Sequence, residues 1–261
     1  MSYIDVRGVS KIYEGGTTAI SDVSFTVEKG EFVSIVGPSG CGKSTLLRAV
    51  AGLRGTSSGT ITVGGRKVTK PYRVGMVFQT PALMPWRTVR DNVLAACVLA
   101  NLPVKKFERR ADELLEIVGL SDFAKSMPSQ LSGGMQQRVS LCRALIHDPD
   151  VLLMDEPFGA LDALTRDDMG VELTRLLAEE GQQKTVLFVT HSISEAIFLS
   201  DRILVMSTRP GRIIRDVASV LPRPRDMEMR TTDGFGSQAG EIFRLLHGED
   251  RRPAGISRPL D

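Results

Sequence analysis

Residues 37–44 constrain this chain more than any other stretch. They read Gly-Pro-Ser-Gly-Cys-Gly-Lys-Ser, which is a glycine, four residues and then Gly-Lys-Ser, the spacing of a loop that wraps phosphates. Residues 32–36 before it are apolar and β-branched and predict a buried strand. Residues 46–51 after it predict a helix that Gly52 can end. A strand, this loop and a helix together predict an α/β fold.

The residue types in this loop explain how it would hold a nucleotide. Glycines let several backbone N–H groups converge on phosphate oxygens, and the helix N-terminus adds positive potential. Lys43 is expected to bridge the β- and γ-phosphates, and the hydroxyl of Ser44 to coordinate Mg²⁺. The alternative is a glycine-rich turn without a ligand, which the flanking strand and helix disfavour.

Length, charge and cysteine content narrow the class of protein. A chain of 261 residues fits one large domain or one domain with subdomains. A net charge of +2 is too small to favour a nucleic acid or a strongly acidic partner. No apolar run is long enough to span a bilayer, and the first residues lack a basic region followed by an apolar stretch, so we expect no secretory signal. Three cysteines without C-x-x-C spacing disfavour disulfides and zinc. We therefore expect a cytoplasmic protein, with Cys41 more simply a tolerated small residue than a reactive thiol.

Short strands are predicted on both sides of the phosphate loop. Alternating or β-branched runs occur at residues 3–9, 23–27, 60–63 and 74–78, the last two around the Gly64-Gly65 turn. Tyr13 lies beside a turn between the first two runs. Its ring could stack on an adenine, although partial burial in the core is the more common role of such a tyrosine.

A second glycine pair lies far along the chain. Residues 131–138 read Leu-Ser-Gly-Gly-Met-Gln-Gln-Arg and lead into a helical run that extends to Leu145. Ser132 is a good N-cap, and Gly133 and Gly134 would leave this helix N-terminus open to close backbone approach. A second phosphate site is therefore possible, but an ordinary capped helix is favoured on these residues alone.

Two carboxylates follow a strongly apolar segment. Residues 151–154 predict a strand buried on both faces, and Asp155 and Glu156 come at its carboxyl end, where ligands bind in open α/β sheets. Asp155 is expected to hold Mg²⁺, and Glu156 to polarise the attacking water. Paired acids at a strand end are often only solvated, but the phosphate loop favours the functional interpretation.

A histidine is predicted at the same sheet edge. Residues 185–189 predict another buried strand, His191 follows it, and residues 192–195 form a capping box that would hold the histidine at the strand–helix junction. A last strand is expected at residues 203–206. Beyond residue 220 the chain is rich in Arg, Pro and Gly, with one short helix at 242–246 and a disordered end.

Helical stripes and one apolar loop complete the chain. Residues 107–118 and 169–177 carry apolar residues at helical spacing and are expected to pack in the core, ended by Gly119 and Gly181. Residues 80–86 contain two prolines together with Leu83, Met84 and Trp86. This loop either folds back on the body or presents an apolar surface to a partner, and the residues favour neither.

In their order and spacing these motifs resemble the ATP-binding subunit of ABC transporters over about residues 3–215. The resemblance implies ATP as ligand and Mg²⁺ as cofactor, with Mg²⁺ held by Ser44, Gln79 and Asp155, and it gives Glu156 and His191 the catalytic roles. The nucleotide contacts that it implies are Tyr13, Gly37, Pro38, Ser39, Gly40, Cys41, Gly42, Lys43, Ser44, Thr45, Gln79, Ser132, Gly133, Gly134 and Asp162.

The same resemblance implies an architecture and a mechanism. We expect an ABC domain over residues 1–215, with a parallel-sheet core, an antiparallel β subdomain and a helical subdomain at about 85–145, followed by an extension at 216–261. Two copies, or this chain and a related ATPase subunit, would close head to tail, each ATP lying between residues 37–44 of one subunit and 132–134 of the other. Hydrolysis would open the dimer and move membrane partners.

Within the family, residues 84–93, 162–166 and 206–213 resemble importers of the nitrate, sulfonate and taurine type. This implies a permease that docks near Leu83, Met84 and Trp86, an extracytoplasmic binding protein, and a peripheral position on the cytoplasmic membrane face. Gly170 departs from the pattern because it places a glycine inside a helix, at a cost of about 1 kcal/mol.

Other functions stay open at this point. An ABC ATPase acting on DNA or the ribosome is disfavoured by a single cassette without long heptads and by the balanced charge. A nucleotide switch without turnover is disfavoured by Glu156 and His191. An exporter, or an importer of a thiamine-precursor pyrimidine, is compatible with the ATPase motifs.

Overall fold

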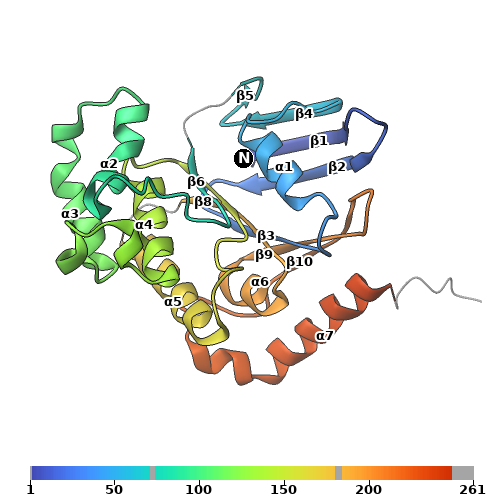
Figure 1. The fold of residues 1–261 in the computed structure, drawn as a ribbon. Coiled ribbons are helices and arrows are strands. Elements are labelled where there is room, and N and C mark those ends of the chain that lie inside the picture. The colour runs from blue at the N-terminus through green and yellow to red at the C-terminus, as the bar shows by residue number, and fades with distance from the viewer. Residues whose placement is uncertain (1, 71–73, 180–183, 249–261) are drawn as a thin grey trace, which may run out of the picture.

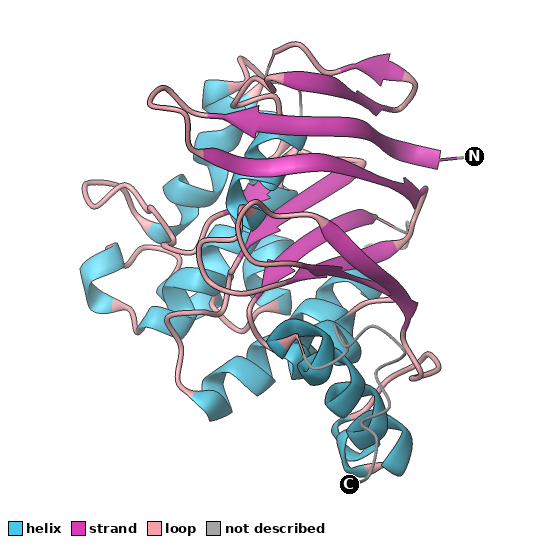
Figure 2. Ribbon diagram, turned by 90° about the vertical axis from the view of Figure 1, so that its right-hand side faces the viewer, coloured by secondary structure: helices cyan, strands magenta, loops and turns pink. Residues whose placement is uncertain are grey.

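The computed structural model describes residues 2–70, 74–179 and 184–248. It contains two sheets: one lies at the centre among the helices, and the other lies at one edge of the molecule next to α1 (Figure 1). The antiparallel sheet has the order β2-β1-β4-β5; its strands are β1 (Ser2–Ile12), β2 (Thr18–Glu28), β4 (Ser58–Val63) and β5 (Arg66–Lys67). The predicted strands at 3–9, 23–27 and 60–63 are confirmed, and the strands are longer than predicted. Figure 2 shows this sheet stacked above the second one.

The second sheet carries the buried apolar strands in the order β10-β9-β3-β8-β7-β6. These are β3 (Phe32–Val36), β6 (Gly75–Val77), β7 (Val151–Asp155), β8 (Thr185–Thr190), β9 (Arg202–Met206) and β10 (Ile213–Ala218). All neighbours pair in parallel except β10, which runs antiparallel to β9. The mixed α/β fold predicted from the sequence is confirmed.

The structure adds to two other strand predictions. The run at 74–78 forms β6, which joins the parallel sheet beside β7 and does not pair with the strand at 60–63. The strand at 203–206 is not the last one, because β10 follows it and pairs with it. The chain reverses after Met206 and returns antiparallel, so the edge of the sheet is an added strand of mixed exposure.

Three helices gather on one side of the parallel sheet: α2 (Val89–Leu99), α3 (Glu108–Ile117) and α4 (Gly133–Leu145) (Figure 1). All three lie within the predicted helical segment at about 85–145. The other helices are α1 (Lys43–Val50), α5 (Ala163–Glu179), α6 (Ile193–Leu199) and α7 (Asp233–His247). Short 3-10 turns occur at η1 (Val104–Lys106), η2 (Ser121–Phe123), η3 (Pro128–Gln130) and η4 (Met227–Thr231).

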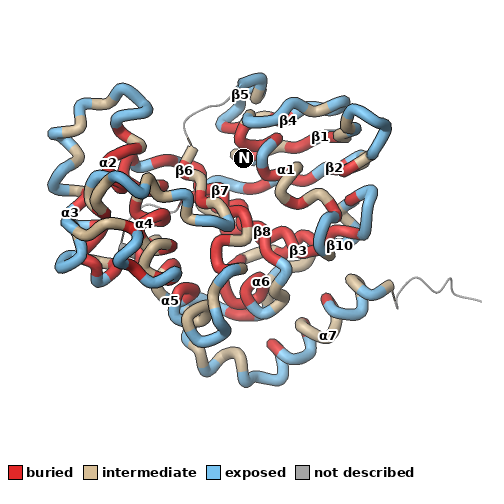
Figure 3. Tube along the Cα trace, viewed as in Figure 1, coloured by how far each residue is buried: buried red, intermediate tan, exposed pale blue. Residues whose placement is uncertain are grey.

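The central strand β3 contributes to two apolar cores. Val33 and Ile35 face the core beneath the antiparallel sheet and α1, whereas Phe32 and Val36 face the core of the helical side. This split follows from the two-residue period of a strand. Figure 3 shows the buried segments concentrated at β3, β7 and β8. The phosphate loop therefore starts from a strand fixed on both faces.

The C-terminal segment contains more structure than the sequence predicted. The short helix at 242–246 is the end of α7, which starts at Asp233 with the side chain of Thr232 as its N-cap. Three glycines in its first half, at 234, 236 and 240, hide the helical pattern. The predicted stop at Gly181 and the predicted disordered end lie outside the described residues. In the part of the chain that the structure describes, no helix combines the length and the apolar character needed to cross a bilayer.

Candidate nucleotide site

The phosphate loop lies at the carboxyl end of β3, between β8 and β9, and leads directly into α1. Gly42 is the N-cap residue of α1, with a φ of 110° and no side-chain cap. A Cβ atom there would lie 2.5 Å from Cγ2 of Ile20 and 2.8 Å from the carbonyl oxygen of Ala19. Both the backbone conformation and the close packing therefore require glycine at this position.

The Lys43 side chain crosses the loop and is almost fully buried. Its ammonium donates to the carbonyl oxygens of Gly37 at 2.7 Å and Pro38 at 3.1 Å, and lies 3.6 Å from Oε1 of Glu156. The cation is therefore fixed between the loop and the carboxylate predicted to act on water. Cys41 of the same loop is buried, and this burial raises the pKa of its thiol, as expected for an inert small residue.

Ser44 and Asp155 meet although they lie 111 positions apart in the sequence. The Ser44 hydroxyl donates to Oδ1 of Asp155 at 2.6 Å, and Oδ2 of Asp155 lies 3.5 Å from the guanidinium of Arg48. A hydroxyl and a carboxylate oxygen side by side are donors that Mg²⁺ prefers. Among the described residues no group of three or more His, Cys, Asp or Glu side chains could hold a metal.

Glu156 and His191 also lie in contact. Nδ1 of His191 is 3.1 Å from Oε2 of Glu156, so the Glu156 carboxylate lies between the imidazole and Lys43. Glu156 has a φ of 47°, an uncommon conformation for a residue with a side chain, and its N–H donates to Val189 of the neighbouring strand at 2.9 Å. The side chain of Gln79 lies close to the turn that follows Glu156, because a Cβ built on Gly159 in this turn would be 3.4 Å from the Gln79 amide nitrogen.

His191 is held differently from the predicted capping box. The Ser192 hydroxyl accepts from the N–H of Glu195 at 3.3 Å, as predicted. The Glu195 carboxylate does not return to Ser192, because it accepts from the Thr190 hydroxyl at 2.5 Å. The N–H of Ser192 donates to Thr190 at 2.9 Å. Only half of the capping box is formed, and burial raises the pKa of Glu195.

Tyr13 lies at the opposite end of the loop. Its hydroxyl is 3.0 Å from the Thr45 hydroxyl, and Arg54 and Lys11 lie over its ring at 5.2 and 5.8 Å. The hydrogen bond to Thr45, with the two cations, lowers the pKa of Tyr13. The ring therefore borders the nucleotide pocket instead of filling the core. This pocket, of about 190 Å³, is lined by Tyr13, Ala19, Gly40, Gly42, Lys43, Ser44, Thr45, Glu156 and Arg209.

Two cations at this site were missed in the sequence. Arg209, in the turn between β9 and β10, donates to the carbonyl oxygen of Gly40 at 2.9 and 3.2 Å. Arg48 contacts Asp155 from one turn further along α1. The helical spacing of Ser44 and Arg48 was a usable signal. Arg209 could have been found only from the strand order, because it follows β9, which lies beside β3. The sequence alone does not give this order.

The structure separates the second glycine pair from this pocket. Ser132 caps α4 as predicted, accepting from the N–H of Met135 at 3.3 Å, but no residue from 132–134 lines the pocket in the described part of the chain. A Cβ on Gly134 would lie 2.9 Å from Cγ2 of Thr165, so this glycine lets α4 approach α5 closely.

Asp162 stands at the start of α5 and also lies outside the pocket. Its carboxylate accepts from the N–H of Thr165 at 3.0 Å and from the Thr165 hydroxyl at 2.7 Å. These bonds lower the pKa of Asp162. Asp162 thus acts as a helix cap within one chain, next to the glycine pair of α4.

The apolar loop at 80–86 combines both alternatives left open by the sequence. Leu83 packs against the core of the helical side, whereas Trp86 is 73% exposed. The buried amide of Asn92 fixes the loop: it accepts from the N–H of Met84 at 2.7 Å and donates to the carbonyl oxygen of Met84 at 3.1 Å. The loop therefore presents an exposed tryptophan from a fixed backbone.

Comparison with known proteins places this geometry in a family. The family model described as ABC transporter matches residues 20–159. The chain is 45% identical over 236 residues to the aliphatic sulfonates import ATP-binding protein SsuB of Bacillus cereus, covering 89% of this chain and 91% of the relative. It is 43% identical over 250 residues to an uncharacterized ABC transporter ATP-binding protein, MJ0412, of Methanocaldococcus jannaschii, covering 94% of this chain and 92% of the relative.

A solved structure agrees with these relatives. The dimeric post-hydrolysis state of the ATP-binding cassette MJ0796, bound to ADP and phosphate, matches with a TM-score of 0.72 and 33% identity, covering 84% of this chain and 100% of that one. The chain therefore has the fold of an ATP-binding cassette. Within this fold the phosphate loop, Asp155 and Glu156, which the sequence analysis singled out, lie next to one another. The chain belongs to the ABC transporter family, as an ATP-binding subunit that hydrolyses ATP.

Proposed function

We propose that the chain energises import of a small anionic solute of the sulfonate, nitrate, taurine or bicarbonate class from the cytoplasmic face of a membrane. Support for the sulfonate class comes from relatives named aliphatic sulfonates import proteins, 45% identical over most of the chain. The solute itself would be bound by a permease and an extracytoplasmic binding protein. We propose residues 1–215 as the ATP-binding domain and 216–261 as an extension, although this boundary crosses β10.

The observation that carries the proposed mechanism is that the second glycine pair, at residues 133–134, lies outside the pocket formed by the phosphate loop. The pocket of about 190 Å³ is smaller than the roughly 300–1,000 Å³ of typical small-molecule sites. The N-terminus of α4 at residues 132–134, where the Ser132 side chain caps one N–H group, lies outside it. In a head-to-tail dimer these residues, with Asp162, would close over the ATP of the partner subunit. The dimeric cassette with 33% identity supports this arrangement.

Within this site each residue has a distinct role. The glycines of 37–42, Lys43 and Thr45 would hold the phosphates, and Tyr13 would stack on the adenine. Ser44, Asp155 and Gln79 would hold Mg²⁺, which neutralises charge on the phosphate oxygens. The Glu156 carboxylate would orient the attacking water, and His191, 3.1 Å from it, would hold the γ-phosphate in line with this water.

A first test traps the dimer. Glu156→Gln keeps the size of the side chain but removes its charge, so steady ATP hydrolysis should fall by about 10²-fold or more while ATP binding continues. Size-exclusion chromatography with ATP should then give a dimer. Glu116→Gln, an exposed position on α3, is the matched control. An ATP-bound monomer, or turnover like that of the unchanged protein, would contradict the composite site.

A second test concerns the permease. Trp86→Ala removes the exposed side chain of a loop held by Asn92, so ATP affinity of the isolated chain should stay the same while co-purification with the permease weakens. Leu99→Ala, at another exposed apolar position, serves as control. A collapse of ATP affinity would mean that the loop supports the core. Uptake of labelled taurine, nitrate and a thiamine-precursor pyrimidine by the recovered complex in vesicles would separate the proposed solutes.

A further inference from the structure

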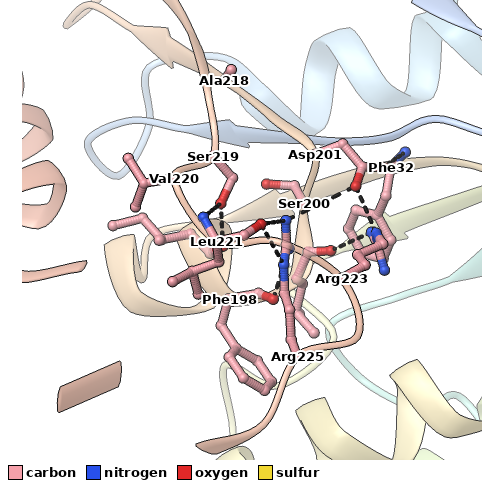
Figure 4. Close-up of polar contacts among 12 residues, drawn as sticks. Phe32, Phe198, Ser200, Asp201, Ala218, Ser219, Val220, Leu221, Arg223 and Arg225 are labelled. Carbon is pink, nitrogen blue, oxygen red and sulfur yellow. Dashed lines mark hydrogen bonds and ion pairs between the residues drawn. The ribbon is translucent and has the colours of Figure 1, made fainter. Parts of the chain in front are cut away.

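The carboxyl end of α6 is bonded to the C-terminal segment. The last four carbonyls of a helix have no partner inside the helix, but here each one accepts a hydrogen bond. The donors are Ser200 to Ala196, Ser219 to Ile197 at 2.9 Å, Arg225 to Phe198 at 2.9 Å and Arg223 to Leu199 at 3.1 Å. Three of the four donors come from residues 219–225, beyond β10 (Figure 4).

Arg225 is the centre of this arrangement. Its side chain is 3% exposed, and besides Phe198 its guanidinium donates to the carbonyl oxygen of Leu221 at 3.0 and 3.3 Å. The Asp201 carboxylate lies 3.9 Å away and pairs more closely with Arg223, at 2.7 Å. Burial, together with the charge of Arg223, lowers the pKa of Arg225 to about 10. A buried cation held largely by carbonyls favours the carboxyl end of a helix, where the dipole is negative.

The same segment continues to a second helix of the site. Arg230 of η4 donates to Asp167 of α5 at 2.5 Å, and its guanidinium lies 4.8 Å from the centre of the Phe198 ring. α5 starts directly after Asp162. Residues 219–230 therefore connect the end of α6 with the first turns of α5.

Because α6 is short, we expect a displacement of its carboxyl end to move its N-terminus, next to His191, as well. It spans seven residues, and its N-cap Ser192 follows His191 directly. We propose that residues 219–230, with Arg225 as the principal positioning residue, fix α6 so that the His191 imidazole stays in register with Glu156. The inference rests on the proposed function, since it assigns a structural cause to the role given there to His191.

Enzyme kinetics provide the first part of the test. In the full chain, Arg225→Ala should lower kcat for ATP hydrolysis by about tenfold to a hundredfold through misplacement of His191, while the Kd for ATP stays the same. Arg215→Ala, an exposed arginine on β10, is the matched control and should behave like the unchanged protein. Adding Arg225→Ala to His191→Ala should cause no further loss, whereas independent effects would multiply.

The NMR signals of the histidine rings distinguish a local displacement of His191 from a general loss of stability, which would affect all histidines. The chain has three histidines, so the His191 ring signals are assigned by their loss in His191→Ala. Arg225→Ala should shift the His191 signals and leave those of His147 in place. Unmoved His191 signals, or multiplied effects in the double variant, would overturn the inference.

The outcomes separate this inference from the proposed function. If His191→Ala hydrolyses ATP normally, the role of His191 is wrong, and the NMR shift alone then decides whether Arg225 positions the ring. If only Arg225→Ala is without effect on turnover and on the ring signals, the inference is wrong and the proposed function stands. If Arg225→Ala does not fold, Ser219→Ala removes one donor to α6 and should shift the same signals by a smaller amount.

Discussion

The helix N-termini of α1 and α4 both carry glycines, but they differ in how their backbone N–H groups are capped. At α1 the N-cap is Gly42, which offers no side chain to the helix N–H groups and is surrounded by Lys43, Ser44 and Asp155 of the same chain. At α4 the Ser132 side chain already satisfies one N–H group. The N-terminus of α1 therefore lies within a pocket of its own chain, whereas that of α4 lies outside it, as the proposed head-to-tail dimer requires.

Among the substitutions that test this difference, Gly42→Ala should have the largest effect on ATP binding and stability. A Cβ would lie 2.5 Å from Ile20 and force a left-handed backbone on alanine, at a cost of about 1–3 kcal/mol before any shift of neighbours. We expect ATP binding of the monomer to be lost and the melting temperature to fall, measured by fluorescent-nucleotide titration and thermal unfolding. Gly133→Ala, where the nearest atom to a Cβ is 3.8 Å away, is the control. Equal binding by both variants would contradict the difference.

Ser132→Ala should give an intermediate effect confined to the dimer. Loss of the cap costs about 1 kcal/mol of stability, and ATP binding by the monomer should not change because the residue lies outside the pocket. Combined with Glu156→Gln, the change should reduce the ATP-dependent dimer seen by size-exclusion chromatography. A weaker ATP affinity of the monomer would show that the two termini act on one nucleotide within a single chain.

Glu195→Gln should give the smallest effect and extends the comparison to a third helix N-terminus, that of α6. Because burial raises the pKa of Glu195 in the folded protein, the folded state favours the protonated acid. The unchanged protein should therefore lose stability as the pH rises from below the unfolded pKa through the folded one. The Gln variant should lack this loss, so the difference in melting temperature between the Gln variant and the unchanged protein should change in favour of the Gln variant as the pH rises above about 4, the ordinary pKa of a glutamate. A constant difference would contradict this assignment.

The features that could be predicted from the sequence are those encoded by short stretches of the chain. The loop at 37–44, the acids after β7 and the cap at Ser132 depend on a few consecutive residues, so local rules are sufficient. The fold class followed from the same segments and is confirmed by related structures.

The errors share a different physical origin. Arg209 and Arg225 act through contacts with backbone carbonyls far away in the sequence, and such contacts leave no periodic pattern. β10 was missed because its pairing with β9 depends on a chain reversal. Only the end of α7 was predicted, because tertiary packing against α6 and β9 stabilises a glycine-rich first half that local propensity disfavours.

The exposed loop that carries Trp86 has a spectroscopic consequence. Trp86 is the sole tryptophan of the chain, and it is 73% exposed on a backbone held by Asn92. Tryptophan fluorescence of the unlabelled protein therefore originates from one point on its surface, outside the nucleotide pocket. Any partner that covers this loop removes water from the indole and shifts its emission to shorter wavelength, so the protein carries its own optical reporter of docking.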